Sequence, residues 1–209
     1  EMNRSLTEGS ITKTMLLFSV PMIVGDLLQQ FYNIADTFIV GRFVGSSALA
    51  AVGSAYALMI FLTSIIIGLS MGSSALFSIC FGQKNMDKLR NCIFVAFLII
   101  GITTVVLNVL AFLFIDPILV FLKTPEEIYT MMRSYVFIIF IGLCATFFYN
   151  FFASLLRSIG NSFIPLVFLA VSAVLNIVLD LLFVVKFNWS VEGAAIATVI
   201  SQYVSGAGI

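Results

Sequence analysis

The sequence contains no histidine among its 209 residues, and only 10% of its residues are charged. The missing histidine removes both the commonest metal ligand and the commonest general base of enzymes. Ten basic and ten acidic residues cancel, and no basic run indicates a nucleic-acid partner. The three cysteines, Cys80, Cys92 and Cys144, stand in apolar stretches without a CxxC or other ligand spacing, so we interpret them as packing residues. We therefore expect no nucleic-acid binding and no cofactor.

Hydrophobic residues, in contrast, make up 61% of the chain, which is typical of an integral membrane protein. A hydrocarbon core of about 30 Å is crossed by about 20 helical residues. Hydropathy divides the chain into six such pieces, which predicts an all-α membrane protein built as a bundle of six transmembrane helices. The predicted spans are residues 15–40, 49–77, 92–115, 128–155, 163–185 and 193–209.

The distribution of basic residues predicts the orientation of these spans. Arg4, Lys13, Lys84, Lys88, Arg90 and Arg157 share one side with the N-terminus, whereas Arg42, Lys123, Arg133 and Lys186 lie on the other. Because basic residues favour the cytoplasmic side, we expect a cytoplasmic N-terminus. The last span stops at Ile209 without a polar tail, so we expect a chain cut at or inside its sixth helix. A second unit of six helices after it would have the same orientation, as in parallel transporter repeats.

One face of the first span is polar. At about 100° per residue, its polar side chains cover a sector of about 120° on a helix that is otherwise apolar. Each carboxylate at the centre of a span costs about 3 kcal/mol to insert, so carboxylates kept there indicate a function. Pro21 lies inside the same span and leaves a backbone carbonyl without its donor, which predicts a bend in this helix. The polar face consists of Asp26, Gln29, Gln30, Asn33, Asp36 and Thr37.

The fifth and sixth spans carry similar polar stripes. Ser172, Asn176 and Asp180 are spaced i, i+4, i+8 and form one ridge, and Thr198, Ser201, Gln202 and Ser205 form another. If the three stripes face one another, Asp36, Asn176, Asp180 and Thr198 supply carboxylate, amide and hydroxyl oxygens, a set suited to a hard monovalent cation. The two carboxyls could equally hold a proton. The sequence leaves sodium and proton open, and we expect no metal beyond such a sodium ion.

Other interpretations compete with this one. Any single Asn, Ser or Thr in a span can simply hydrogen-bond across a helix contact, and Gly68 and Gly72 form a GxxxG pair that close helix packing would explain. Asp26 fits a proton site or a water-lined position equally well. An intramembrane aspartyl protease would need a GxGD segment, which the sequence lacks. A purely structural membrane subunit would tolerate the loss of both Asp36 and Asp180.

Five segments together resemble the multidrug and toxic compound extrusion (MATE) transporters, especially their DinF-like prokaryotic branch, and the resemblance covers the whole chain. They are YNIADTFIVG in the first span, GLSMGSSALFSICFGQKN in the second, LLRSIGNSFIPL before the fifth, NIVLDLLFV within it, and VEGAAIATVISQ in the sixth. Members of this family have twelve helices in two lobes and export drugs in exchange for sodium ions or protons. The resemblance implies that this chain is the N-terminal lobe, that the C-terminal lobe is its missing partner, and that it resides in a prokaryotic inner membrane.

The resemblance also implies residue roles. Asp36, Asn176, Asp180 and Thr198 correspond to a cation site inside the lobe, with Asp26, Gln29, Asn33 and Gln202 as further polar-stripe residues. Pro21 is implied to be the position where the first helix bends when that site changes occupancy. The implied function is not enzymatic: it is cation-coupled export of small organic, aromatic cations by alternating access. A lipid-linked saccharide flippase of the same wider superfamily is the alternative, and it would require a more cationic cavity.

Overall fold

The structure is a computed structural model that describes residues 11–209. All regular elements in this part of the chain are helices. The first ten residues, including Arg4 of the orientation count, lie outside the described residues. The helices are α1 (Ile11–Phe43), α2 (Ser46–Gly82), α3 (Met86–Leu113), α4 (Ile115–Phe121), α5 (Glu126–Ile141), α6 (Leu143–Ser158), α7 (Phe163–Asp180), the π-helix η1 (Leu181–Lys186) and α8 (Val191–Gly208).

Local sequence signals set several helix ends. Gly45, with a φ of 122°, separates α1 from α2 in a conformation that suits glycine. The Asn85 side chain accepts a hydrogen bond from the backbone N–H of Lys88 and thereby caps α3. Pro125 directly precedes α5, and Gly160, with a φ of 91°, follows α6. The long apolar runs between these signals form the helices.

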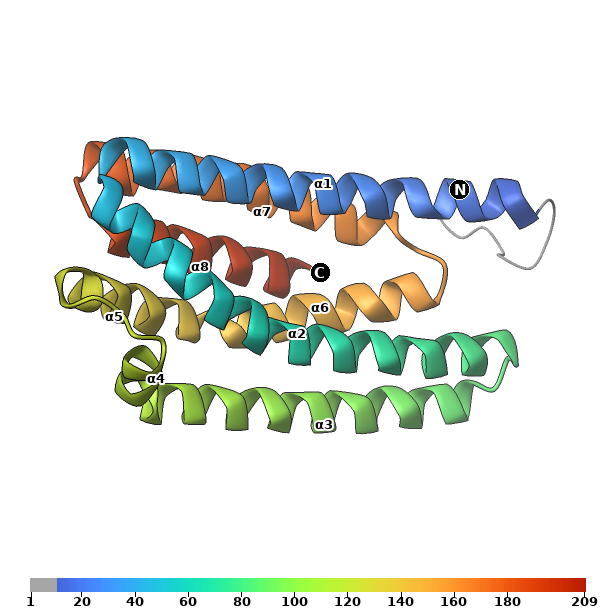
Figure 1. The fold of residues 1–209 in the computed structure, drawn as a ribbon. Coiled ribbons are helices and arrows are strands. Elements are labelled where there is room, and N and C mark those ends of the chain that lie inside the picture. Colours follow the sequence, from blue (N-terminus) through green and yellow to red (C-terminus); the bar gives the residue numbers. More distant parts are fainter. Residues whose placement is uncertain (1–10) are drawn as a thin grey trace.

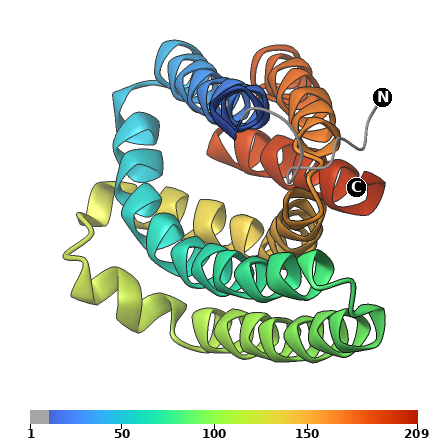
Figure 2. The same cartoon turned by 90° about the vertical axis from the view of Figure 1, so that its right-hand side faces the viewer.

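The helices pack as one elongated bundle (Figures 1 and 2). α1 lies along α7, and α7 lies along α8. On the other side, α2 packs against α6 and α3, and α3 forms the outer edge of the bundle. α8 is the interior helix, because it contacts α5, α6 and α7 and its alanines Ala194, Ala195 and Ala197 are fully buried.

Four helices are long and apolar enough to cross a membrane, or five when α5 and α6 count as one bent span. They are α1, α2, α3 and α7 with η1. The sixth predicted span, 193–209, falls on α8, which is not among them because small and polar residues lower its apolarity. A helix enclosed by protein on several sides does not need the apolar surface that a lipid-facing helix needs.

The fourth predicted span, 128–155, is divided in the structure. α5 and α6 meet at Gly142 with a bend of 43°. The carbonyls freed at the bend find donors on other helices: Asn108 Nδ2 donates to the carbonyl of Phe140 at 2.5 Å, and the Tyr203 hydroxyl donates to the carbonyl of Ile141 at 2.9 Å. A broken helix is tolerated within a membrane where neighbouring side chains satisfy its backbone in this way.

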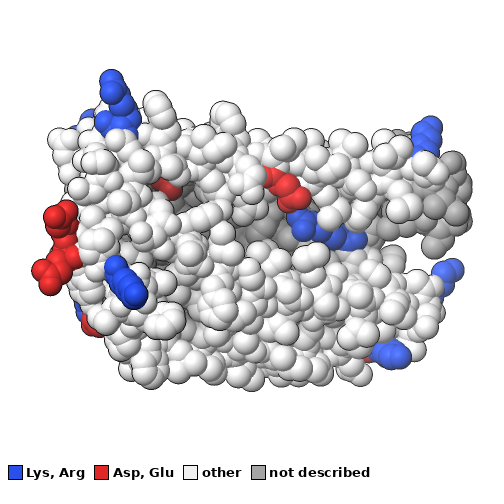
Figure 3. Space-filling view, viewed as in Figure 1, with Lys and Arg blue, Asp and Glu red and all other residues white. Residues whose placement is uncertain are grey.

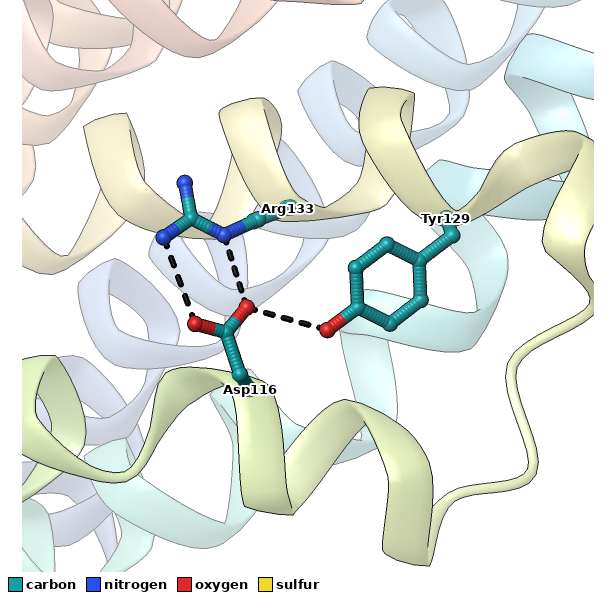
Figure 4. Close-up of polar contacts among 3 residues, drawn as sticks. All are labelled: Asp116, Tyr129 and Arg133. Atoms are coloured by element: carbon teal, nitrogen blue, oxygen red, sulfur yellow. Dashed lines mark hydrogen bonds and ion pairs between the residues drawn. The ribbon is translucent and has the colours of Figure 1, made fainter.

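The short helix α4 was not predicted. It is fastened to α5 by Asp116, whose carboxylate accepts hydrogen bonds from Arg133 Nε at 2.7 Å and from the Tyr129 hydroxyl at 2.9 Å (Figure 4). Arg133 Nη2 makes a longer contact with the second carboxylate oxygen at 3.3 Å. Both donors lower the pKa of the Asp116 carboxyl, with the Arg133 hydrogen bond as the larger cause. Asp116 therefore stays ionised and links α4 to α5, while Ile115 and Leu119 bury the apolar side of α4.

Candidate cation site

Asp36, Asn176, Asp180 and Thr198 come together where α1, α7 and α8 meet. The packing of α1 along α7 brings the two carboxyl groups, Asp36 and Asp180, within direct interaction range of each other. Asn176 precedes Asp180 by one helical turn and lies on the same face of α7. Its Nδ2 donates to the Thr198 hydroxyl of α8 at 3.2 Å. Three helices thus contribute polar side chains to one small volume.

These side chains are buried away from the surface of the bundle. Asp180 is 0% exposed, Asn176 2% and Asp36 9%. The Oδ1 atom of Asp36, the Oδ1 atom of Asn176 and both carboxylate oxygens of Asp180 have no hydrogen-bond donor in the described part of the chain. Buried polar atoms are almost always paired, so four unpaired oxygens at one place need an explanation. All four oxygens are acceptors that lack a partner, and a bound cation or added protons would supply one.

The backbone beside the site is also unusual. Asp180 is the last residue of α7, and the chain continues directly into the π-helix η1. π-helical turns inside α-helices are rare and are found often at functional sites. Here the turn lies next to Asp180, the most deeply buried carboxyl among residues 11–209.

The other residues of the predicted stripes do not join this group. Asp26 and Gln29 are exposed on α1, and Asp26 is about 15 Å from Asp36 along the helix axis, given a rise of 1.5 Å per residue. Asn33 is half-buried, and its carbonyl accepts a hydrogen bond from the Thr37 hydroxyl. Gln202 packs its amide oxygen against Gly142, at the bend between α5 and α6.

Two tyrosines near the site were missed. Tyr32 on α1 and Tyr135 on α5 lie within electrostatic range of both Asp36 and Asp180. Tyr32 stands four residues before Asp36, so its place on the same helical face could have been read from the spacing. Tyr135 gave no such signal, because its position depends on how α5 packs in the bundle.

The predicted close packing at Gly68 and Gly72 is wrong for the described part of the chain. A methyl group added at either glycine would meet no atom within 4 Å. The close approach lies elsewhere, on α8, where a methyl at Gly206 would stand 2.8 Å from the carbonyl oxygen of Ala145. A GxxxG spacing states that a close contact is sterically allowed, but not that a partner helix is there.

Pro21 lies inside α1, and α1 continues through it without interruption from Ile11 to Phe43. Figure 1 draws α1 as one rod along α7. The structure thus contains the unbroken form of this helix, and a bent form stays a prediction.

Comparison with known proteins identifies the family of this chain. The MatE family model matches residues 21–182. Two proteins of Bacillus subtilis (strain 168) are similar: the probable multidrug resistance protein YpnP is 31% identical over 196 residues, which are 94% of this chain and 44% of YpnP. The probable multidrug resistance protein YoeA is 34% identical over 199 residues, which are 93% of this chain and 43% of YoeA.

The fold leads to the same family. The outward-facing structure of a multidrug resistance MATE family transporter of the MOP superfamily superposes with a TM-score of 0.90 at 26% identity, covering 96% of this chain and 44% of that one. The chain spans about half the length of the curated relatives that it matches. It belongs to the MatE family and is an all-α integral membrane protein with the fold of one lobe of a MATE transporter.

Proposed function

We propose that this chain is the N-terminal half of a cation-coupled multidrug antiporter and that Asp36, Asn176, Asp180 and Thr198 bind the coupling ion, Na⁺ or H⁺. One observation carries the proposal: four buried oxygen atoms of this group have no donor within the described part of the chain. A sodium ion prefers oxygen ligands of this kind, and protons would supply the missing donors. Either ion turns an unfavourable cluster into a satisfied one.

The location of the site suggests how ion binding drives transport. The carboxyls join α1 to α7, so filling or emptying the site changes the contact between these two helices. Pro21 gives α1 a point where it can bend, because the proline cannot donate a backbone hydrogen bond. Each charge that crosses the membrane inward can supply about 2.3 kcal/mol per 100 mV. This energy favours one conformation of α1 over the other and thereby drives export.

The proposed substrates are small organic cations with aromatic character. The two similar proteins from Bacillus subtilis are named as probable multidrug resistance proteins, which supports small-molecule substrates. The 22 phenylalanines of the chain supply aromatic faces that attract such cations. A central substrate cleft needs a second wall, so we propose that a C-terminal lobe is the partner and that both lobes sit in a prokaryotic inner membrane with the N-terminus in the cytoplasm.

Ethidium efflux from pump-deficient bacteria tests the proposal. The full-length transporter that contains this chain is compared with its Asp36→Asn and Asp180→Asn variants, and Asp26→Asn is the matched control because it removes a carboxylate from the exposed part of the same helix. We expect efflux to fall to the background of untransformed cells in the first two variants and to persist in the control. The imposed gradient, sodium or proton, that restores efflux in de-energised cells identifies the ion.

Two results would overturn the proposal. Normal efflux in both Asp36→Asn and Asp180→Asn would show that the buried carboxyls do not couple transport. No efflux from wild-type protein that has reached the membrane would exclude the organic cations tested as substrates.

A further inference from the structure

A second site lies on the outer flank of the bundle, away from the cation site. A groove of about 410 Å³ runs between α3 and α6. Its lining includes residues of these two helices and none of the four residues of the cation site. α3 is the outermost helix of the bundle, so this flank is turned away from α1, α7 and α8 (Figure 2).

The apolar part of the groove is a set of packed aromatic rings. Phe97 of α3 and Phe151 of α6 meet edge to face with ring centroids 5.3 Å apart, and Phe152 packs at 6.3 Å from Phe97. Phe151 is buried and forms the floor, whereas Phe94 is 63% exposed at the edge. Interlocked rings of this kind have little freedom, so the groove is a preformed apolar surface.

One end of the groove is polar and positively charged. Arg90 and Asn91 line it, and both are exposed. In residues 11–209 the Arg133–Asp116 pair is the only ion pair, so the charge of Arg90 is not neutralised there. Lys84 and Lys88 flank the same helix start, against a single acidic residue, Asp87. Figure 3 shows Lys and Arg side chains at both ends of the bundle, but few acidic ones at the right-hand end, where Figure 1 places the turn between α2 and α3.

Along α3, the charged end of the groove and its aromatic part follow each other in the same order as the headgroup and the acyl chains of a lipid. Arg90 lies in the second turn of α3, just before the predicted span 92–115. Phe94 and Phe97 follow at about 6 Å and about 10 Å along the helix, from a rise of 1.5 Å per residue. A positive charge at headgroup depth with an apolar trough beneath it is the arrangement that anionic lipids recognise on membrane proteins. The same positive charge disfavours the organic cations that aromatic surfaces otherwise attract.

We propose that the groove between α3 and α6 binds an anionic phospholipid. The Arg90 guanidinium and the Asn91 amide donate to the phosphate, since a guanidinium matches phosphate oxygens with two parallel donors. One acyl chain lies over Phe94, Phe97 and Phe152. This inference rests on the membrane location of the chain and does not depend on the coupling ion or the exported substrate.

Quenching of an introduced tryptophan tests this site. Phe94→Trp places the probe in the groove of the full-length transporter, and its signal is the difference in emission from the parent protein. The protein is reconstituted in vesicles in which either phosphatidylglycerol or phosphatidylcholine carries brominated acyl chains, at equal mole fraction. We expect brominated phosphatidylglycerol to be enriched about fivefold at the probe, from the attraction of one basic residue for anionic lipid.

Two further substitutions separate a specific site from general attraction. Adding Arg90→Gln should abolish the preference for phosphatidylglycerol, whereas Lys123→Gln, which removes a basic residue from the turn before α5, should leave it intact. Equal quenching by both lipids, or a preference that survives Arg90→Gln, would overturn the proposal. Absence of quenching by either lipid would also overturn it, because the rest of the transporter would then cover the groove.

Discussion

The contact between α6 and α8 at Gly206 makes a sharp prediction about stability. A methyl group at Gly206 would stand 2.8 Å from the backbone carbonyl oxygen of Ala145, whereas ordinary van der Waals contact begins at 3.4 Å. The two helices would have to separate by about 0.6 Å, the difference between these distances. A backbone carbonyl cannot rotate away as a side chain can, so Gly206→Ala forces a shift of a whole helix.

The expected cost follows from two opposing effects. Overpacking of a tight contact destabilises proteins by about 1–3 kcal/mol. Alanine in place of glycine inside a helix stabilises the helix by up to about 1 kcal/mol. Gly72→Ala is the matched control, because a methyl group there meets no atom within 4 Å. This substitution therefore gains only the higher helix propensity of alanine. The difference between the two variants therefore isolates the steric cost, and we expect Gly206→Ala to be less stable than Gly72→Ala by about 1–3 kcal/mol.

Thermal unfolding of the purified full-length transporter in detergent measures this difference. A thiol-reactive dye reports unfolding through Cys80, which is buried in the folded protein. We expect a clearly lower melting temperature for Gly206→Ala and an unchanged or slightly higher one for Gly72→Ala. Equal melting temperatures for the two variants would refute the close approach of α6 and α8 at Gly206.

Two further predictions concern polar contacts outside the cation site. Because Arg133 lowers the pKa of Asp116, the contribution of this carboxylate to stability is fully present above the unfolded carboxyl pKa of about 3.9 and is lost as the pH falls through the lower folded value. Melting curves of wild type and Asp116→Asn should therefore differ at pH 7 and converge in acid. A difference that persists in acid would contradict the ion pair. Tyr203→Phe removes the donor to the carbonyl of Ile141 at the bend between α5 and α6. It should lower the free energy of unfolding by about 0.6 kcal/mol, and at most by about 1.7 kcal/mol, the range for such hydrogen bonds in membranes. A melting temperature equal to that of wild type would show that water satisfies this carbonyl.

The composition and the polar spacing carried most of the information about this fold. Asn176 and Asp180 could be placed on one face of a helix from their spacing, and the cost of Asp36 in a span marked it as a residue kept for a reason. The structure brings these residues together with Thr198. Their role in binding an ion stays a prediction, since geometry gives their positions and not their ligand.

Features that depend on distant contacts were not predictable. The bend at Gly142 involves no proline, and its carbonyls are satisfied by Asn108 and Tyr203, which lie 32 and 62 residues away from their acceptors. Tyr135 reaches the carboxyls only because of the way α5 packs. Gly72 and Gly206 look alike in the sequence, yet only Gly206 meets another helix. Periodicity predicts which face of a helix is polar or small, but not which neighbour covers that face.

The interior position of α8 has a consequence for how the lobe enters a membrane. A segment with many alanines, glycines and serines and with Gln202 gains little from contact with lipid and more from contact with protein. Such a segment inserts efficiently only when helices are already present to receive it. α5, α6 and α7, which enclose α8, all precede it in the chain and leave the ribosome first. The helices that enclose α8 are therefore synthesised before α8 itself.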